Sequence, residues 1–111
     1  METTMDPERI GRTEALFREV NERIAESAVR LRASDAEFVC ECADSDCTTR
    51  IEATLAEYEQ VRDDGATFLL VPGHEDKRIE AVVETQAEHA VVEKTHPQVV
   101  PVVLSLNPRA A

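Results

Sequence analysis

The sequence predicts an α+β fold, in which a long N-terminal helix packs on a small, mostly antiparallel sheet that carries a zinc site. Three observations support this class: apolar residues at helical spacing in the first third, short strand-like runs bounded by turn residues after it, and three cysteines within residues 40–47. At 111 residues the chain has the size of one domain, 1–111. We expect 1–33 to form the helix, 37–96 the zinc-binding core, and 97–111 a proline-containing tail.

The N-terminal helix is predicted to begin at Asp6, an N-cap residue followed by Pro7 at the first helical position. Its apolar residues recur at spacings of three, four and seven: Ile10, Phe17, Val20, Ile24 and Leu31, with Leu16 beside them. Its polar face is predicted to carry three i,i+4 ion pairs: Glu14 with Arg18, Glu19 with Arg23, and Glu26 with Arg30. We expect the apolar stripe to dock on the domain, and a homodimer formed through this helix is the alternative.

A short strand is predicted over Phe38-Val39-Cys40-Glu41-Cys42, because this run is apolar and compatible with β structure. Side chains alternate in a strand, so both thiols point to the same face. The following Ala-Asp-Ser-Asp sequence is typical of a turn and would bring Cys47 back toward them. A further extended piece is expected over residues 50–53.

The second helix is predicted from a capping box, in which Thr54 caps the helix and Glu57 reaches back to it. Its apolar face consists of Leu55, Tyr58 and Val61, and Gly65 ends it. A buried strand is then expected over residues 67–71, stopped by Pro72-Gly73, with His74 on the turn.

Two valine-rich runs within residues 79–95 favour a hairpin, although a helix over 77–86 fits the pattern nearly as well. The tail contains prolines at 97, 101 and 108, so we expect an irregular or extended segment there.

The cysteines are the residues most informative about function. Cys40, Cys42 and Cys47 form a Cys-x-Cys-x4-Cys pattern, and with His74 they supply the sulfur and imidazole ligands of a tetrahedral zinc site. Four protein ligands close the site, so the zinc is expected to be structural. Two alternatives stay open: the thiols are buried core residues, or His89 or His96 is the fourth ligand.

Other metal chemistries fit the pattern less well. A zinc deaminase requires a Cys-x-x-Cys pair and a glutamate two residues after its first ligand, and the chain has neither arrangement. Iron–sulfur proteins with a Cys-Asp-Gly-Ser-His motif share the Cys-x-Cys spacing but have a histidine soon after the last cysteine. Here Thr48 follows Cys47, so zinc is the better prediction.

Several stretches resemble a group of small actinobacterial proteins of uncharacterised function: ALFREVNERI, FVCEC with Cys47, EYEQVR, PGHE and VVEK. These stretches are spread along most of the chain, and such proteins similarly carry the three cysteines and the PGHE turn. The tail PQVVPVVLSLNPR differs from them. The resemblance implies no activity.

The charge distribution bears on possible partners. The formal charge is −11, and residues 33–64 hold ten acidic residues against two arginines. Direct nucleic-acid binding is not expected, because it depends on clustered lysines and arginines. A basic protein partner would suit this surface, while solubility alone is the simpler explanation. No run resembles a signal peptide or approaches the roughly 20 apolar residues of a membrane span, and we expect a cytoplasmic protein.

These observations predict a zinc-stabilised interaction or regulatory module with an acidic surface. The alternative is a redox-active or metal-dependent enzyme that uses the cysteine cluster. We see no Ser-His-Asp set and no glycine-rich phosphate loop, so an enzyme is the less favoured of the two.

Overall fold

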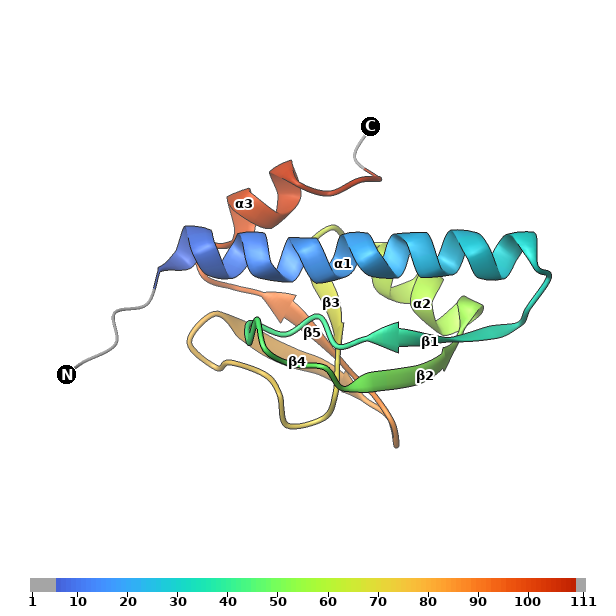
Figure 1. The fold of residues 1–111 in the computed structure, drawn as a ribbon. Coiled ribbons are helices and arrows are strands. Elements are labelled where there is room, and N and C mark those ends of the chain that lie inside the picture. Colours follow the sequence, from blue (N-terminus) through green and yellow to red (C-terminus); the bar gives the residue numbers. More distant parts are fainter. Residues whose placement is uncertain (1–5, 110–111) are drawn as a thin grey trace.

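The computed structural model describes residues 6–109. In chain order its elements are α1 (Pro7–Arg30), β1 (Asp35–Val39), β2 (Arg50–Thr54), α2 (Leu55–Arg62), β3 (Thr67–Leu70), β4 (Glu80–Thr85), β5 (Ala90–Lys94) and α3 (Val100–Ser105) (Figure 1). The predicted α+β class with a long N-terminal helix is confirmed. The parts of the predicted helix before residue 6 and of the predicted tail after residue 109 lie outside the described residues.

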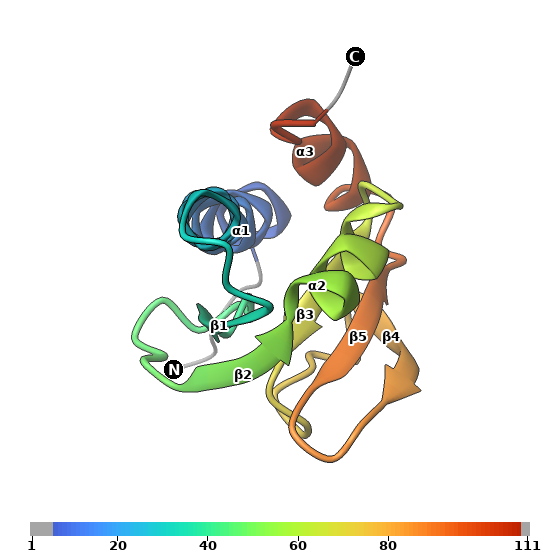
Figure 2. The same ribbon diagram turned by 90° about the vertical axis from the view of Figure 1, so that its right-hand side faces the viewer.

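The strands form two antiparallel sheets instead of the single sheet predicted. β1 pairs with β2, with Phe38 opposite Ile51, and the second sheet has the order β3-β5-β4, with Phe68 opposite Val92. Seen along α1, the helix lies over β1, and α3 stands beside it above the three-stranded sheet (Figure 2). β4 pairs with β5 in an antiparallel hairpin. The hairpin predicted within residues 79–95 is therefore confirmed, and the alternative helix over 77–86 is wrong.

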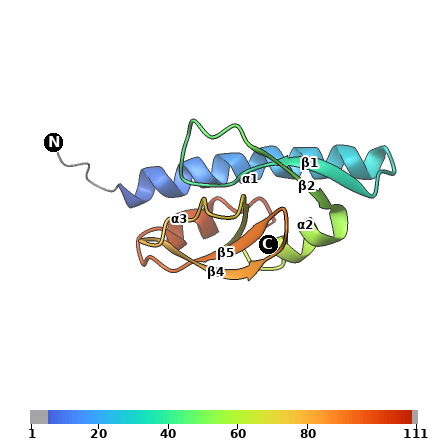
Figure 3. The same cartoon turned by 90° about the horizontal axis from the view of Figure 1, so that it is seen from below.

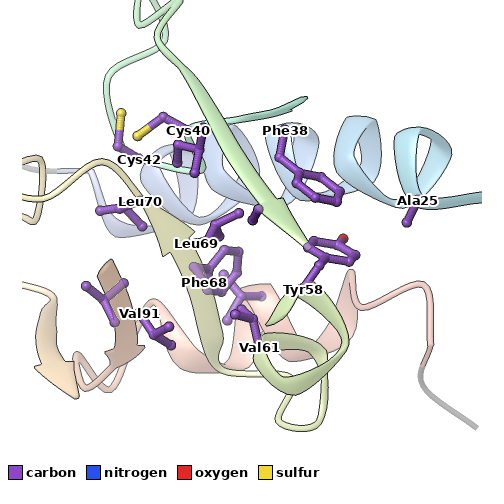
Figure 4. Close-up of a cluster of buried hydrophobic side chains, with 14 of the residues drawn as sticks. Ala25, Phe38, Cys40, Cys42, Tyr58, Val61, Phe68, Leu69, Leu70 and Val91 are labelled. Carbon is purple, nitrogen blue, oxygen red and sulfur yellow. The ribbon is translucent and has the colours of Figure 1, made fainter. Parts of the chain in front are cut away.

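The hydrophobic core fills the space between the two sheets and the helices. Phe38 stacks on Tyr58 with ring centroids 4.5 Å apart, a geometry worth about 0.5–1.5 kcal/mol beyond the buried area. The other large, fully buried apolar residues are Ile51, Phe68, Leu69, Leu70, Ile79, Val92, Val99 and Val103. Cys40 and Cys42 belong to the same cluster and border it (Figure 4). Two of the candidate ligands are thus joined to the core.

The N-terminal caps predicted for α1 and α2 are present in the structure. The Asp6 carboxylate accepts a hydrogen bond from the Arg9 backbone N–H at 3.2 Å, so the predicted cap of α1 is confirmed. The predicted capping box of α2 is also present: Thr54 Oγ1 accepts from the Glu57 N–H at 3.0 Å, and the Glu57 carboxylate accepts from the Thr54 N–H at 2.8 Å. The helix ends at Arg62, slightly before the predicted stop at Gly65.

Contrary to the apolar stripe predicted, the buried face of α1 carries four polar side chains among small residues: Glu14, Arg18, Asn21 and Glu22. Glu14 and Arg18 were expected to pair on the surface, yet both side chains are fully buried. The Glu14 carboxylate accepts from Lys94 Nζ at 2.8 Å, and Arg18 donates to the carbonyl oxygens of Gly65 and Val103 at 2.7 and 2.6 Å. Partners far away in the sequence therefore replace the predicted local pair.

The predicted apolar stripe of α1 is buried only in part. Ile10 and Ile24 pack against the core, whereas Val20 and Leu31 are exposed and Leu16 is 63% exposed. Of the other two predicted pairs, Glu19 with Arg23 forms at 3.0 Å, and Glu26 bonds Arg23 instead of Arg30.

Small residues allow α1 to approach α3 closely. An added Cβ on Gly11 would lie 2.8 Å from Val102 Cγ1, which is too close for carbon atoms. The helix α3 itself corrects the expectation of an irregular or extended tail. Pro101 lies in its first turn, where proline is tolerated, and Val103 is buried. Packing on α1 thus orders a segment whose own propensity for helix is weak.

Within residues 6–109, none of the helices combines the length and the apolar character needed to cross a membrane.

Candidate metal centre

The end of β1 positions the first two candidate ligands. The strand ends at Val39, earlier than predicted, and the chain leaves it through Cys40 and Glu41 into a bend that begins at Cys42. The Cys40 N–H donates to the Thr49 carbonyl at 3.2 Å, and the Glu41 N–H donates to the Leu69 carbonyl at 2.8 Å. Cys40 and Cys42 are 1% and 2% exposed. Both thiols are therefore held by backbone hydrogen bonds to neighbouring segments.

A tight turn returns Cys47 to the first two cysteines. The Asp44 carboxylate accepts from the Asp46 N–H at 2.9 Å, and the Asp44 carbonyl accepts from the Cys47 N–H at 3.0 Å. Aspartate favours such turns because its side chain bonds backbone two residues on. Cys47 is half-buried, so it is the most accessible of the three thiols.

His74 reaches the thiols from the turn after β3. The His74 N–H donates to the Val71 carbonyl at 3.0 Å, and Gly73 between them has φ +92°, which suits glycine. His74 Nδ1 lies 3.6 Å from Cys40 Sγ and 3.7 Å from Cys47 Sγ. The ligand atoms of Cys40, Cys42, Cys47 and His74 all lie within 4.8 Å of one another. The structure thus brings together the four residues predicted from the sequence.

These distances fit a tetrahedral zinc ion. With zinc–sulfur and zinc–nitrogen bonds of about 2.3 and 2.05 Å, a tetrahedron separates sulfur from nitrogen by about 3.6 Å and sulfur from sulfur by about 3.8 Å. The two sulfur–nitrogen distances therefore already have the required length, and the others need changes of about 1 Å or less. The cluster is compatible with a metal site.

The electrostatic environment requires a cation if the thiols are to ionise together. Burial raises the pKa of both Cys40 and Cys42, and the neighbouring thiols add to this for Cys40. The Val71 N–H donates to Cys40 Sγ at 3.2 Å, which favours negative charge on that sulfur but is outweighed. At Cys47 the modest burial also raises the pKa, yet hydrogen bonds from Thr49 and the other thiols lower it overall. A divalent ion would offset the cost of the buried thiolates.

Glu41 connects this loop to α1, a role that the sequence analysis missed. It lies between two candidate ligands, and its side chain is fully buried. Its carboxylate accepts from Asn21 Nδ2 at 2.7 Å and from the Leu69 N–H at 2.9 Å. Asn21 also bonds both the N–H and the carbonyl of Val39, each at 2.8 Å. The Cys-Glu-Cys sequence could have indicated this role, because side chains that alternate in direction would turn Glu41 away from the cysteines and into the protein.

The other two histidines lie elsewhere. His89 is buried in the loop before β5, and His96 Nδ1 accepts from the Gln98 N–H at 3.0 Å. Among the described residues, the grouping suited to a metal ion contains neither of them.

No family model, curated protein or solved structure matches this chain. The resemblance to small actinobacterial proteins therefore stays a prediction.

Proposed function

We propose that this protein is a small interaction or regulatory module whose fold is stabilised by a structural zinc ion. The observation that carries the proposal is the convergence of three thiols and one imidazole within 4.8 Å, from two loops that are distant in sequence. Thiolate and imidazole ligands select zinc over the hard cations magnesium and calcium, which prefer oxygen. The ligand set supports the assignment of Cys40, Cys42, Cys47 and His74.

The closed ligand set favours a structural role over a catalytic one. A catalytic zinc keeps one position for water or substrate, whereas four protein ligands occupy the whole tetrahedron. The ion would join the β1–β2 loop to the turn after β3. The chain has no tryptophan, one tyrosine and three phenylalanines, so its core is small and a metal link contributes a large share of its stability.

An acidic surface supports a protein partner and not nucleic acid. The formal charge of −11 repels phosphates and attracts basic surfaces, which raises the rate of association with a basic protein. A cytoplasmic location suits a zinc thiolate site, since reducing compartments keep cysteines available for metal.

Metal analysis of purified protein, together with its ultraviolet–visible spectrum, tests the proposal. We expect one zinc per chain and no absorption in the visible range. Iron with charge-transfer bands would refute the zinc assignment. Removal of the metal by a chelator should lower the melting temperature strongly, and an unchanged melting temperature would refute the structural role.

A redox or metal-dependent enzyme is the second candidate, and it is favoured by one observation. Cys47 and His74 lie at the accessible side of the cluster, so reagents can reach them. X-ray absorption spectroscopy distinguishes the two candidates. Three sulfurs and one nitrogen indicate the closed structural site, while a water oxygen in place of a protein ligand indicates an open, reactive one.

A further inference from the structure

A second site is lined by residues of α2 and of the β4–β5 hairpin. Figure 3 shows α2 beside the end of this hairpin. The site is a pocket of about 200 Å³, and none of the candidate metal ligands lines it. Pockets for drug-sized ligands have about 300–1,000 Å³, so this one has the size for a single side chain. Val61, Val83 and Val91 give it apolar walls.

A β-bulge shapes this pocket. Val82 pairs with Val92 and Glu84 with Val91, so Val83 is an extra residue in β4. Consecutive strand residues normally point to opposite faces, yet Val83 and Glu84 both line the pocket. Bulges redirect side chains in this way and are frequent next to functional sites.

Three of the polar side chains that line the pocket are acidic. Glu57, Asp64 and Glu84 line it, and no lysine or arginine does. Each carboxylate accepts one hydrogen bond within the fold, from the Thr54 N–H, the Ala66 N–H and Gln86 Nε2 respectively. A carboxylate has about four acceptor positions, so each retains capacity for a further donor. The Thr54 N–H is the main cause that lowers the pKa of Glu57, which keeps this group ionised.

His89 supplies the independent sign of a ligand. It lines the pocket and is only 4% exposed. Its backbone carbonyl accepts from the Gln86 N–H at 2.8 Å. Within residues 6–109 its imidazole has no hydrogen-bond partner, and its ring nitrogens are not among the fully buried unpartnered atoms, so they keep some exposure to solvent. A mostly buried imidazole with accessible nitrogens, next to carboxylates, fits a ligand that donates hydrogen bonds.

We propose that this pocket receives an arginine side chain of a protein partner. The valine walls would contact the methylene groups, and the planar guanidinium would donate to the carboxylates and to His89 through its five N–H groups. An anion would be repelled by the carboxylates. This inference rests on the interaction role proposed above and assigns it a place and a chemistry.

The test is an NMR titration of the zinc-loaded full chain with a capped pentapeptide that has a central arginine between glycine and serine residues. We expect saturable shifts of the Val83, Glu84 and His89 amides. The same peptide with citrulline, which is neutral and nearly isosteric, should cause no such shifts, and the lysine peptide should bind more weakly. Citrulline or lysine peptides that bind as tightly as arginine would overturn the inference.

Two substitutions test whether the arginine peptide binds in this pocket. Glu84 accepts a hydrogen bond only from an exposed glutamine within the described chain, so Glu84→Gln should leave the fold intact and weaken arginine binding about tenfold. The matched control is Glu88→Gln in the loop of the same hairpin, since Glu88 is exposed and does not line the pocket. Equal binding by both variants would overturn the inference. Zinc content measured on the same samples distinguishes this inference from the proposed zinc site. If zinc-loaded protein does not bind the arginine peptide, the arginine pocket is refuted and the zinc site is not.

Discussion

Replacement of Asn21 by alanine tests the link between α1 and the cysteine loop. The substitution removes three hydrogen bonds: to the Val39 carbonyl, from the Val39 N–H, and to the Glu41 carboxylate. A buried group left without a partner costs about 1–3 kcal/mol. Here one oxygen of the Glu41 carboxylate and two backbone groups lose theirs, while the other carboxylate oxygen keeps the Leu69 N–H. Alanine is the better helix former by up to about 0.7 kcal/mol, which offsets a little of the loss. We expect Asn21→Ala to lower the free energy of unfolding by about 3–5 kcal/mol.

Urea denaturation followed by circular dichroism, with zinc-loaded protein in every sample, measures this change. Ser27→Ala is the matched control on the same helix, because Ser27 is partly exposed and its hydroxyl accepts, among residues 6–109, only from Arg30 Nη2 at 3.2 Å. The control should change the free energy of unfolding by less than about 0.5 kcal/mol. If Asn21→Ala also stays within about 1 kcal/mol of the wild type, water replaces the lost partners and the reasoning is refuted.

Three further predictions concern the metal, the buried ion pairs and the core. Cys42→Ser and His74→Ala should each lower both the zinc content and the melting temperature, and full zinc retention in either variant would exclude that residue as a ligand. Burial raises the pKa of Glu14 to about 8 in the folded protein, above its value near 4.5 in the unfolded chain. Its stabilising contribution is therefore complete below about pH 4.5 and is lost as the pH rises through 8, so Glu14→Gln should flatten the pH dependence of the unfolding free energy in that window. The Tyr58 hydroxyl is buried without a partner among the described residues, so Tyr58→Phe should be neutral or raise stability by up to about 1 kcal/mol in thermal denaturation.

Local signals were read correctly from the sequence, because neighbouring residues determine them. The capping box of Thr54 and Glu57 depends on residues three apart, and the turn before Cys47 depends on aspartates within the same loop. The cluster of thiols was also a local pattern. His74 could be favoured as the fourth ligand only through its rigid turn, and its distances to the thiols depend on how β3 lies against the end of β1.

Contacts between residues distant in the sequence account for the two incorrect predictions, on the buried face of α1 and on the tail. Hydrophobic periodicity missed the polar side chains on the buried face of α1, since nothing near Glu14 in the sequence shows that Lys94 will meet it. The tail was expected to be irregular because its valines and Pro101 disfavour helix, yet packing against Gly11 orders it as α3. Both errors have the same cause, which is that the partner lies more than 70 residues away.

The polar inner face of α1 also fixes where along its axis the helix can sit. An interface of interchangeable apolar side chains tolerates sliding, but here Glu14 has to meet Lys94, and Asn21 has to meet Val39 and Glu41. A shift by one helical turn, about 5.4 Å, would leave buried charges opposite the wrong groups. Deletion of a single residue between these positions would rotate them by about 100° relative to each other, so that only one could be satisfied. The number of residues between Glu14 and Asn21 is therefore as constrained as the identities of these two residues.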